Sequence, residues 1–345
     1  MSTSSQAFVA HPPELASAHL SRRNLLRLGV ATGAGAWPAL HAAAQGPTDA
    51  WPNRPIKWVV PYLAGTGPDS SARILSEAVG TALGQPVVIE NRPGAGGNIG
   101  ARLVARAPAD GYTWLYSGSP MAAAMRVYKQ PGFDVFKDFQ HVLGMSRSDI
   151  LIVVQPESGI RTLADLVARA KAGSITYGSG GVGTPSHLGV ELLLSSLNLQ
   201  ANHIPYKGAS ELVNAIMGKQ VTFGAPVFSV AYPFVQSGKM LALGVASAQR
   251  NAHLPKVPTL AEQGVANVNL VSWGGLSVPA GTPPEIVARL RQTFETVLRK
   301  PDLVTALERN GGLVDVRDGE HYTQSFQREI AFTETMMKRV KLEPI

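Results

Sequence analysis

Three glycine clusters in this 345-residue chain each follow an apolar segment and offer backbone N–H groups to a bound anion. The first contains Gly65 and Gly67, the second spans residues 94–97 and the third spans residues 180–183. Glycine adopts unusual backbone angles and lets a ligand approach the main chain closely. Where such a loop leads into a helix, the first N–H groups of that helix can face an anion. The chemistry that these residues favour is recognition of an anion by main-chain donors.

The second cluster has an alternative interpretation as a dinucleotide-binding loop. Its glycines are followed by Gly100 and stand between an expected strand and an expected helix, as in the G-x-G-x-x-G pattern. That pattern requires an acidic residue at the end of a second strand about 20 residues further on, and none stands there. Residues 21–44 have the features of an export signal, and an exported protein would meet little nicotinamide cofactor. We therefore expect no cofactor.

Hydrolytic and metal chemistry find no support in the sequence. The absence of cysteine excludes disulfides, thiol nucleophiles and thiolate metal ligands. No G-x-S-x-G elbow is present, and the adjacent Ser186 and His187 do not by themselves make a catalytic triad. Metal-ligand spacing is also absent among the histidines beyond the N-terminal region, which are His141, His187, His203, His253 and His321. We expect neither an enzyme nor a metal site.

The elements that must position the glycine loops alternate between strand-like and helix-like segments. Expected strands cover residues 56–62, 87–90, 113–117, 150–154, 176–178, 203–204, 221–225 and 241–246. Expected helices cover 69–83, 99–107, 162–172 and 322–341, and the third of these begins with a capping pair, Thr162 and Asp165. This alternation favours α/β layers with mainly parallel sheets, whose ligands lie beyond the carboxyl ends of the strands.

Length and charge restrict the possible functions. A chain of 345 residues corresponds to roughly two domains of about 100–200 residues each. The net charge is +7, but residues 1–45 contribute three arginines and one glutamate, which leaves five excess positive charges for the remainder. No basic stripe interleaved with aromatic residues is present, so nucleic acid is excluded as a partner.

Residues 1–44 are predicted to be an export signal that is removed. The sequence SRRNLLR at residues 21–27 is a twin-arginine pattern, an apolar stretch spans residues 28–40, and Ala42–Ala44 offer a small-residue cleavage site before Gln45. The apolar stretch is too short for the roughly 20 residues that span a bilayer. A Sec-type signal with an extended head is the alternative. In either case the expected location of the mature protein is the periplasm.

Six segments along the chain together resemble one family of receptors. They are PYLAGTGPD at 61–69, ENRPGAGGNIG at 90–100, APADGYT at 107–113, YGSGGVGTPSHL at 177–188, HIPYKG at 203–208 and PAGTP at 279–283. These segments resemble the Bug-type substrate-binding receptors of tripartite tricarboxylate transporters. The resemblance covers essentially the whole chain after the predicted signal.

The resemblance implies a two-lobed, clamshell (type II) periplasmic-binding-protein fold with a mixed sheet flanked by helices in each lobe. Lobe 1 is expected to combine residues 52–145 with residues 273–345, and lobe 2 to cover residues 146–272. The implied function is capture of a small carboxylate, either a dicarboxylate or an aromatic acid, and its delivery to the membrane permease subunits. A receptor that reports its ligand to a signalling partner is the alternative. We expect a monomer.

The resemblance also implies that ligands are held by loops at the strand ends, largely through N–H groups, hydroxyls and water. On this chain the candidates are Tyr62, Leu63, Gly65, Thr66, Asp69, Ser117, Ser119, Gly183, Thr184, Ser186, His187 and Lys207. Several have structural alternatives. The alternative for Tyr62 and for His187 is an aromatic or imidazole ring packed in the core. Asp69 and Thr184 could instead cap a helix, and Lys207 could be exposed to solvent.

Two positions depart from the family pattern. Many relatives have a glycine pair where this chain has Gly65 and Thr66, so Thr66 adds a hydroxyl at the mouth of the first loop. Relatives often place an aspartate after the strand equivalent to residues 221–225, where this chain has Pro226. That aspartate could pair with a ligand ammonium. Its replacement predicts weak or no binding of glutamate and aspartate.

Overall fold

The computed structural model describes residues 51–265, 268, 270–309 and 312–345. All of these residues belong to one compact unit, Pro47–Ile345. The predicted export signal lies outside the described residues. Within the described part of the chain, no helix has both the length and the apolar composition needed to cross a membrane.

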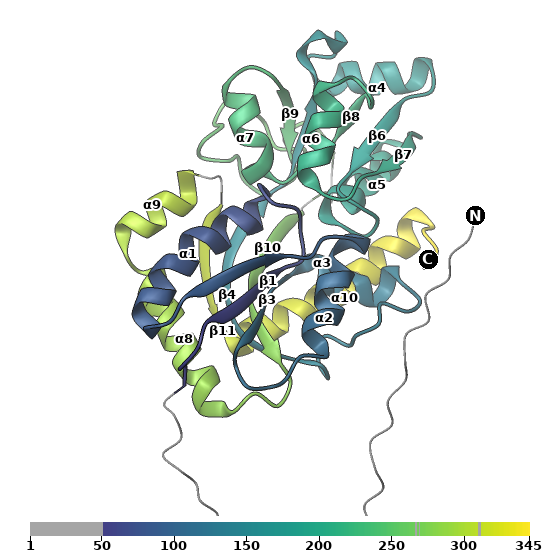
Figure 1. The fold of residues 1–345 in the computed structure, drawn as a ribbon. Helices are drawn as coiled ribbons and strands as arrows, with labels where there is room; N and C mark the ends of the chain where they lie inside the picture. The colour runs from purple at the N-terminus through teal and green to yellow at the C-terminus, as the bar shows by residue number, and fades with distance from the viewer. Residues whose placement is uncertain (1–50, 266–267, 269, 310–311) are drawn as a thin grey trace, which may run out of the picture. The chain divides into compact units, whose positions relative to one another are not determined.

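Six strands form the larger of two sheets, in the order β11-β4-β10-β3-β1-β2 (Figure 1). Their bounds are β1 Ile56–Val60, β2 Val87–Asn91, β3 Thr113–Gly118, β4 Phe139–Asp149, β10 Val271–Pro279 and β11 Leu313–Asp318. Strand β1 pairs in parallel with β2 and β3, whereas β10 pairs antiparallel with β3 and β4. Strand β11 pairs antiparallel with β4, so the sheet is mixed.

Helices cover both faces of the larger sheet because its strands alternate apolar side chains between them. Trp58 and Val60 pack on α1 (Gly67–Leu83) and α8 (Pro284–Leu298), while Val59 faces the opposite side. That side is covered by α2 (Asn98–Ala105), α3 (Ser119–Val127) and α10 (Gly319–Val340). Helix α9 (Pro301–Arg309) follows α8 and packs on α1 and β11.

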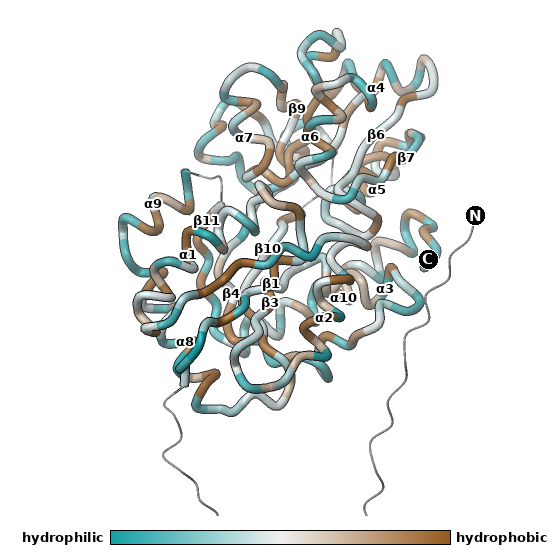
Figure 2. Tube along the Cα trace, in the orientation of Figure 1, coloured by the Kyte–Doolittle hydropathy of each residue, from teal (hydrophilic) through white to brown (hydrophobic). Residues whose placement is uncertain are grey.

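The smaller sheet contains five strands in the order β7-β6-β8-β5-β9. Their bounds are β5 Leu151–Val154, β6 Thr176–Ser179, β7 Asn202–Pro205, β8 Phe223–Gly224 and β9 Leu241–Val245. Ile152 and Val154 face α4 (Leu163–Ala172) and α5 (Pro185–Leu197), and Leu151 and Val153 face the other side. Helices α6 (Ala209–Met217) and α7 (Phe228–Gln236) cover that second side. Along most helices the trace in Figure 2 alternates between hydrophobic and hydrophilic residues, as expected for helices with one buried face.

Helix α10 contributes to the cores of both sheets. Tyr322 and Phe326, in its first half, pack in the core of the larger sheet with residues of α2 and α3. Met336 and Met337, near its end, pack in the core formed by the smaller sheet with α4 and α5. The chain therefore connects the two sheets at residue 150, at residue 270 and again along α10.

Several sequence-based expectations can be compared directly with these elements. The capped helix is confirmed: α4 spans Leu163–Ala172, and Thr162 and Asp165 form a complete capping box. The expectation of mainly parallel sheets is wrong, because β4, β5, β10 and β11 pair antiparallel with their neighbours. The predicted lobe boundaries at 145/146 and 272/273 lie inside β4 and β10, a few residues from the points where the chain passes between the sheets.

Candidate functional site

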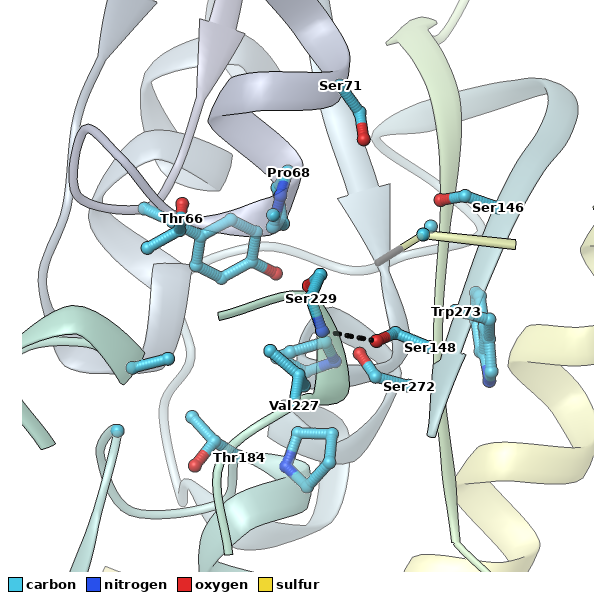
Figure 3. A pocket seen from close by; sticks show the side chains of 18 of the residues that line it. Thr66, Pro68, Ser71, Ser146, Ser148, Thr184, Val227, Ser229, Ser272 and Trp273 are labelled. Atoms are coloured by element: carbon cyan, nitrogen blue, oxygen red, sulfur yellow. Dashed lines mark hydrogen bonds between the residues drawn. The ribbon is translucent and has the colours of Figure 1, made fainter. Parts of the chain in front are cut away.

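A cavity of about 100 Å³ lies between the starts of the smaller sheet's helices and the ends of β4 and β10 (Figure 3). A single water needs roughly 10–15 Å³ of such space, so the cavity can hold several waters or a small organic ligand. Hydroxyl side chains dominate its polar lining: Thr66, Ser71, Ser146, Ser148, Thr184, Ser186, Ser229 and Ser272. Tyr62, Tyr116 and Trp273 add aromatic surface.

Five helices direct their N-terminal ends toward this cavity. Their first turns or cap residues line it through Thr66, Gly67 and Pro68 of α1, Pro120 of α3, Thr184, Pro185 and Ser186 of α5, Gly208 and Ala209 of α6, and Val227 and Ser229 of α7. None of the five has a side-chain cap. Away from the cavity, α4 and α10 are capped by Thr162 and Asp318, whereas α2 and α8 also lack a side-chain cap. The N–H groups of Gly67, Ser186 and Ala209 donate to no described residue.

The ends of β4 and β10 supply the opposite wall. Ser148 and Ser272 are cross-strand partners and point into the cavity (Figure 3), and Ser148 Oγ accepts from the Ser229 N–H at 3.3 Å. Ser146 hydrogen-bonds to the Tyr116 hydroxyl at 2.9 Å.

Charged side chains are almost absent from the lining. Only Arg147 is charged among the described lining residues, and none of them carries a carboxylate. Arg147 pairs across the strands with Trp273, whose ring packs on Tyr322 and Phe326 of α10. Arg147 is exposed and lines the cavity together with Ser146 and Ser148. Apart from Arg147, the polar groups that line the cavity are neutral.

Asp69 holds the first loop in place. Its carboxylate is 3% exposed and accepts from the Gly65 N–H at 2.9 Å, from the Asn91 amide at 2.9 Å and from Arg73 at 3.0–3.1 Å. Burial raises the pKa of Asp69, but these donors outweigh that effect and hold the pKa below its usual range. Thr66 Oγ1 donates to the Leu63 carbonyl at 2.7 Å, so the hydroxyl braces the loop from within.

The loop after β6 is held by a second set of hydrogen bonds. His187 Nδ1 accepts from the Gly183 N–H at 3.2 Å, and Thr184 Oγ1 donates to the Gly181 carbonyl at 2.7 Å. Ser186 Oγ accepts from the Gly180 N–H at 2.8 Å. Thr184 is the N-cap residue of α5 by position, but its side chain does not cap the helix.

Two imidazoles are stacked behind this loop. The rings of His187 and His203 have centroids 4.2 Å apart, and His203 Nε2 hydrogen-bonds to Ser179 at 2.6 Å. Burial lowers the pKa of His187 to about 3, with His203 adding to the effect, and lowers that of His203 to about 4. Both rings are therefore neutral at neutral pH, and the acceptor role of Nδ1 places the proton of His187 on Nε2.

The predicted site residues divide into those that line the cavity and those that lie behind it. Tyr62, Thr66, Thr184 and Ser186 line it, whereas Gly65, Asp69, Gly183 and His187 shape the loops. Of the others, Leu63 packs beside Gly208 and Lys207 is exposed. Ser117 is fully buried and hydrogen-bonds to Ser277 and Tyr322, and Ser119 is buried with no partner for its hydroxyl among the described residues.

Four lining residues were not predicted from the sequence: Ser146 and Ser148 of β4, Ser272 of β10 and Ser229 of α7. These strands contain many serines and glycines, so they carry no apolar run that would identify them as strands. For Ser229 the available signal was Pro226, three residues earlier, at one of the two positions that depart from the family pattern. Among the described residues, no group of three or more histidine or acidic side chains could hold a metal ion.

Contacts cross the cavity on more than one side. The Tyr128 hydroxyl, next to α3, donates to the Val182 carbonyl in the loop before α5 at 3.2 Å. Leu63 lies beside Gly208 at the start of α6, and Ser148 of β4 accepts from Ser229 of α7. The elements of the two sheets are thus closed on one another around the cavity.

Residues 71–342 match the model of a family described as "Tripartite tricarboxylate transporter family receptor". The chain belongs to this receptor family. A protein from the gbd 5′ region of Cupriavidus necator is 34% identical over 330 residues, covering 93% of this chain and 96% of the relative. Protein BugT of Bordetella pertussis is 33% identical over 273 residues, covering 78% and 84% respectively.

Solved structures of similar receptors share the fold. The Rhodopseudomonas palustris protein Rpa4515, solved with adipate, has a TM-score of 0.83 at 30% identity and covers 86% of this chain and 100% of its own. The periplasmic binding protein BugD has a TM-score of 0.82 at 29% identity, covering 86% and 100%. MatC of Rhodopseudomonas palustris, solved with malate, has a TM-score of 0.78 at 28% identity, covering 83% and 99%. The predicted Bug-type, two-lobed receptor fold is confirmed, and the family is one of receptors, not of enzymes.

Proposed function

We propose that this receptor captures a small carboxylate in the cavity between its two sheets and delivers it to a membrane permease. The observation that carries the proposal is the convergence of five helix N-termini without side-chain caps on one cavity. Each N-terminus carries roughly half a positive charge and several N–H groups without helical partners. Such ends favour negative ligand groups.

Neutral donors suffice for a carboxylate when several of them converge. The free N–H groups of Gly67, Ser186 and Ala209 come from α1, α5 and α6, so a ligand would contact elements of both sheets. Hydroxyls of Ser148, Ser272 and other lining residues add donors that can also accept from a ligand hydroxyl. Hydrogen bonds to a charged acceptor contribute about 1.5–3 kcal/mol each, more than those between neutral groups.

Closure of the two sheets on each other completes the proposed mechanism. The contacts of Tyr128 with Val182 and of Ser229 with Ser148 hold the closed form. A ligand that contacts both sides stabilises this form over an open one, which is a hinge-type closure. Opening at the membrane would then release the ligand to the permease.

The relatives support the choice of ligand class and compartment. Rpa4515 was solved with adipate and MatC with malate, and BugD is described as a periplasmic binding protein. By analogy we assign this chain to the periplasm, with export through the predicted twin-arginine signal at residues 1–44, and expect it to act as a monomer. Tyr62, Thr66, Thr184 and Ser186 remain the proposed ligand contacts from the sequence, joined by Ser146, Ser148, Ser229 and Ser272.

A thermal-shift screen of the purified protein tests the proposal. The panel contains adipate, malate, other carboxylates, sugars and nucleotides. A ligand at 100 times its dissociation constant adds about 2.7 kcal/mol of stability, which is readily seen as a higher melting temperature. Stabilisation confined to carboxylates is the expected result. Stabilisation by sugars or nucleotides alone would overturn the assignment.

A further inference from the structure

The two ligand loops, one on each sheet, have the same construction. In each, a glycine with positive φ precedes a threonine N-cap: Gly65 (+77°) before Thr66, and Gly183 (+79°) before Thr184. Both threonine hydroxyls donate to the carbonyl three residues earlier, at 2.7 Å in each case. In both loops the side chain at the third helical position accepts the glycine N–H, through Asp69 in the first loop and His187 in the second.

The two acceptors differ in charge and surroundings. Asp69 is ion-paired with Arg73, one turn further along α1. The equivalent position on α5 is Glu191, which hydrogen-bonds to the Tyr177 hydroxyl. A carboxylate at position 187 would therefore face another acidic residue at i+4 in place of an arginine, and like charges at this spacing repel. The imidazole accepts the same hydrogen bond without adding a negative charge behind the cavity.

We propose that His187 is a positioning residue for ligand binding: its Nδ1 fixes the Gly183 N–H and thereby holds Thr184 and Ser186 at the cavity. This inference rests on the proposed carboxylate-binding function. His187 itself does not line the cavity; it is 2% exposed and packed against His203 and Tyr177. His187 therefore affects ligand binding indirectly, by fixing the conformation of the loop that contains Gly183 and Thr184. A neutral acceptor is required at this point, and histidine in its Nε2–H form provides one.

Three substitutions of His187 separate the effect of its hydrogen-bond acceptor from the effect of its stacked imidazole ring. In His187→Asn the side-chain oxygen occupies the place of Nδ1 and accepts the same N–H, whereas His187→Leu has a similar size and no acceptor. His187→Asp keeps the acceptor and adds a charge. All three lose the stacked ring, so differences among them report the acceptor and its charge alone.

Two measurements on the purified proteins test the proposal. Calorimetry gives the dissociation constants for adipate and malate, and amide hydrogen exchange by NMR reports whether the Gly183 N–H stays protected. We expect the Asn variant to bind within about threefold of its parent and the Leu variant to bind about tenfold more weakly, with rapid exchange at Gly183. The Asp variant should protect Gly183 yet bind about tenfold more weakly, because its charge repels the anion.

The outcomes distinguish failure of the inference from failure of the proposed function. Equal affinity of the Asn and Leu variants, or equal exchange at Gly183 in both, would overturn the positioning role while leaving carboxylate binding intact. If the parent protein bound neither adipate nor malate, the ligand class itself would be wrong, and the role of His187 in binding it would fall with it. Should the Leu variant fail to fold, His187→Ala, which also has no acceptor, replaces it in both measurements, with the same expected loss of affinity and rapid exchange at Gly183.

Discussion

A β-carbon built on Gly67 would lie 2.1 Å from the Oγ of Ser229 and 2.9 Å from its Cβ. Gly67 is the first residue of α1 on the larger sheet, and Ser229 is near the start of α7 on the smaller sheet. The two residues therefore meet across the cavity, where both also line it. The closed arrangement leaves no room for a side chain at position 67. Glycine is needed there because the two sheets close on each other and not because of the backbone conformation, since the φ angle of Gly67 is not positive.

Replacing Gly67 by alanine should weaken ligand binding by about tenfold or more while the unliganded protein stays folded. The added methyl group clashes with Ser229 only when the sheets close, and overpacking of this kind costs about 1–3 kcal/mol. Calorimetry with the carboxylate found in the screen, alongside a melting curve, checks this. Gly67→Ala combined with Ser229→Gly should regain most of the affinity, because the clashing side chain is removed.

Gly173→Ala is the matched control for this substitution. A β-carbon at Gly173 meets nothing within 4 Å, and its φ of 178° is extended backbone that any residue adopts. It should leave affinity unchanged. Equal affinity of the Gly67→Ala variant and its parent would mean that the ligand-bound form is more open than the structure described here.

Malate should bind at least tenfold more tightly than aspartate. The two share a four-carbon dicarboxylate skeleton and differ in a hydroxyl against an ammonium group. The described lining residues include many hydroxyls and no carboxylate, so an ammonium would be buried without a counter-ion. Parallel calorimetric titrations provide the measurement. Micromolar affinity for aspartate or glutamate would contradict the prediction and indicate an acceptor that the lining does not reveal.

Glu329→Gln should stabilise the protein more at pH 8 than at pH 5. Burial raises the pKa of Glu329 to about 7, and its carboxylate accepts from the indole N–H of the lining residue Trp273 at 3.1 Å. A pKa raised above the unfolded value means that the folded state is disfavoured once the pH rises through the range from about 4.5 to 7. Glutamine keeps an acceptor for the indole and has no charge. The gain at pH 8 should be about 1–3 kcal/mol.

Urea unfolding of both proteins at pH 5, 6, 7 and 8 tests the Glu329 prediction. Glu320→Gln, at an exposed position on the same helix, is the control and should show no such pH dependence. A stability difference between Glu329→Gln and its parent that stays constant from pH 5 to pH 8 would show that Glu329 ionises normally in the folded state.

Mild acid should destabilise the protein through three imidazoles, of which His141 and His187 are buried and His203 is half-buried. Burial lowers the pKa of His141 and His203 to about 4 and that of His187 to about 3. Below about pH 6.5 the unfolded chain takes up protons that the folded state does not, so stability is lost as the pH falls. His141 and His187 should each contribute about 1–2 kcal/mol between pH 7 and pH 5, and His203, which is more exposed to solvent, should contribute less.

His141→Gln should reduce this acid sensitivity, and His253→Gln, at an exposed position, should not. Unfolding free energies of the three proteins at pH 7, 6 and 5 provide the comparison. An identical loss in all three would assign the acid sensitivity to other groups.

The parts of the fold that were predicted from the sequence are those with an apolar pattern. Strand β1, with its buried Trp58 and Val60, and helix α4, with its capping box, were expected near their observed places. Their side chains make contacts that depend mainly on local periodicity. The glycine loops at Gly65 and Gly183 were also located, because a positive φ at a helix start favours glycine.

The strands that build the opposite wall of the cavity were not predicted. The last residues of β4, from Ser146 to Asp149, and the first of β10, around Gly274 and Gly275, are polar or small. They stay in the sheet because neighbouring strands on both sides supply the hydrogen bonds, which is a long-range effect. A single sequence shows no local sign of such pairing. Ser148 and Ser272 were missed for this reason.

The position of β10 also determines the order in which the two sheets can form during synthesis. Strand β10 lies between β3 and β4, and it pairs Gly274 with Gly118 across a long stretch of chain. Until residues 271–279 leave the ribosome, β3 and β4 present unpaired edges, whereas all strands of the smaller sheet have already appeared by Val245. The sheet that begins first on the chain is therefore completed last. During that interval the open edges of β3 and β4 are exposed to pairing with other chains.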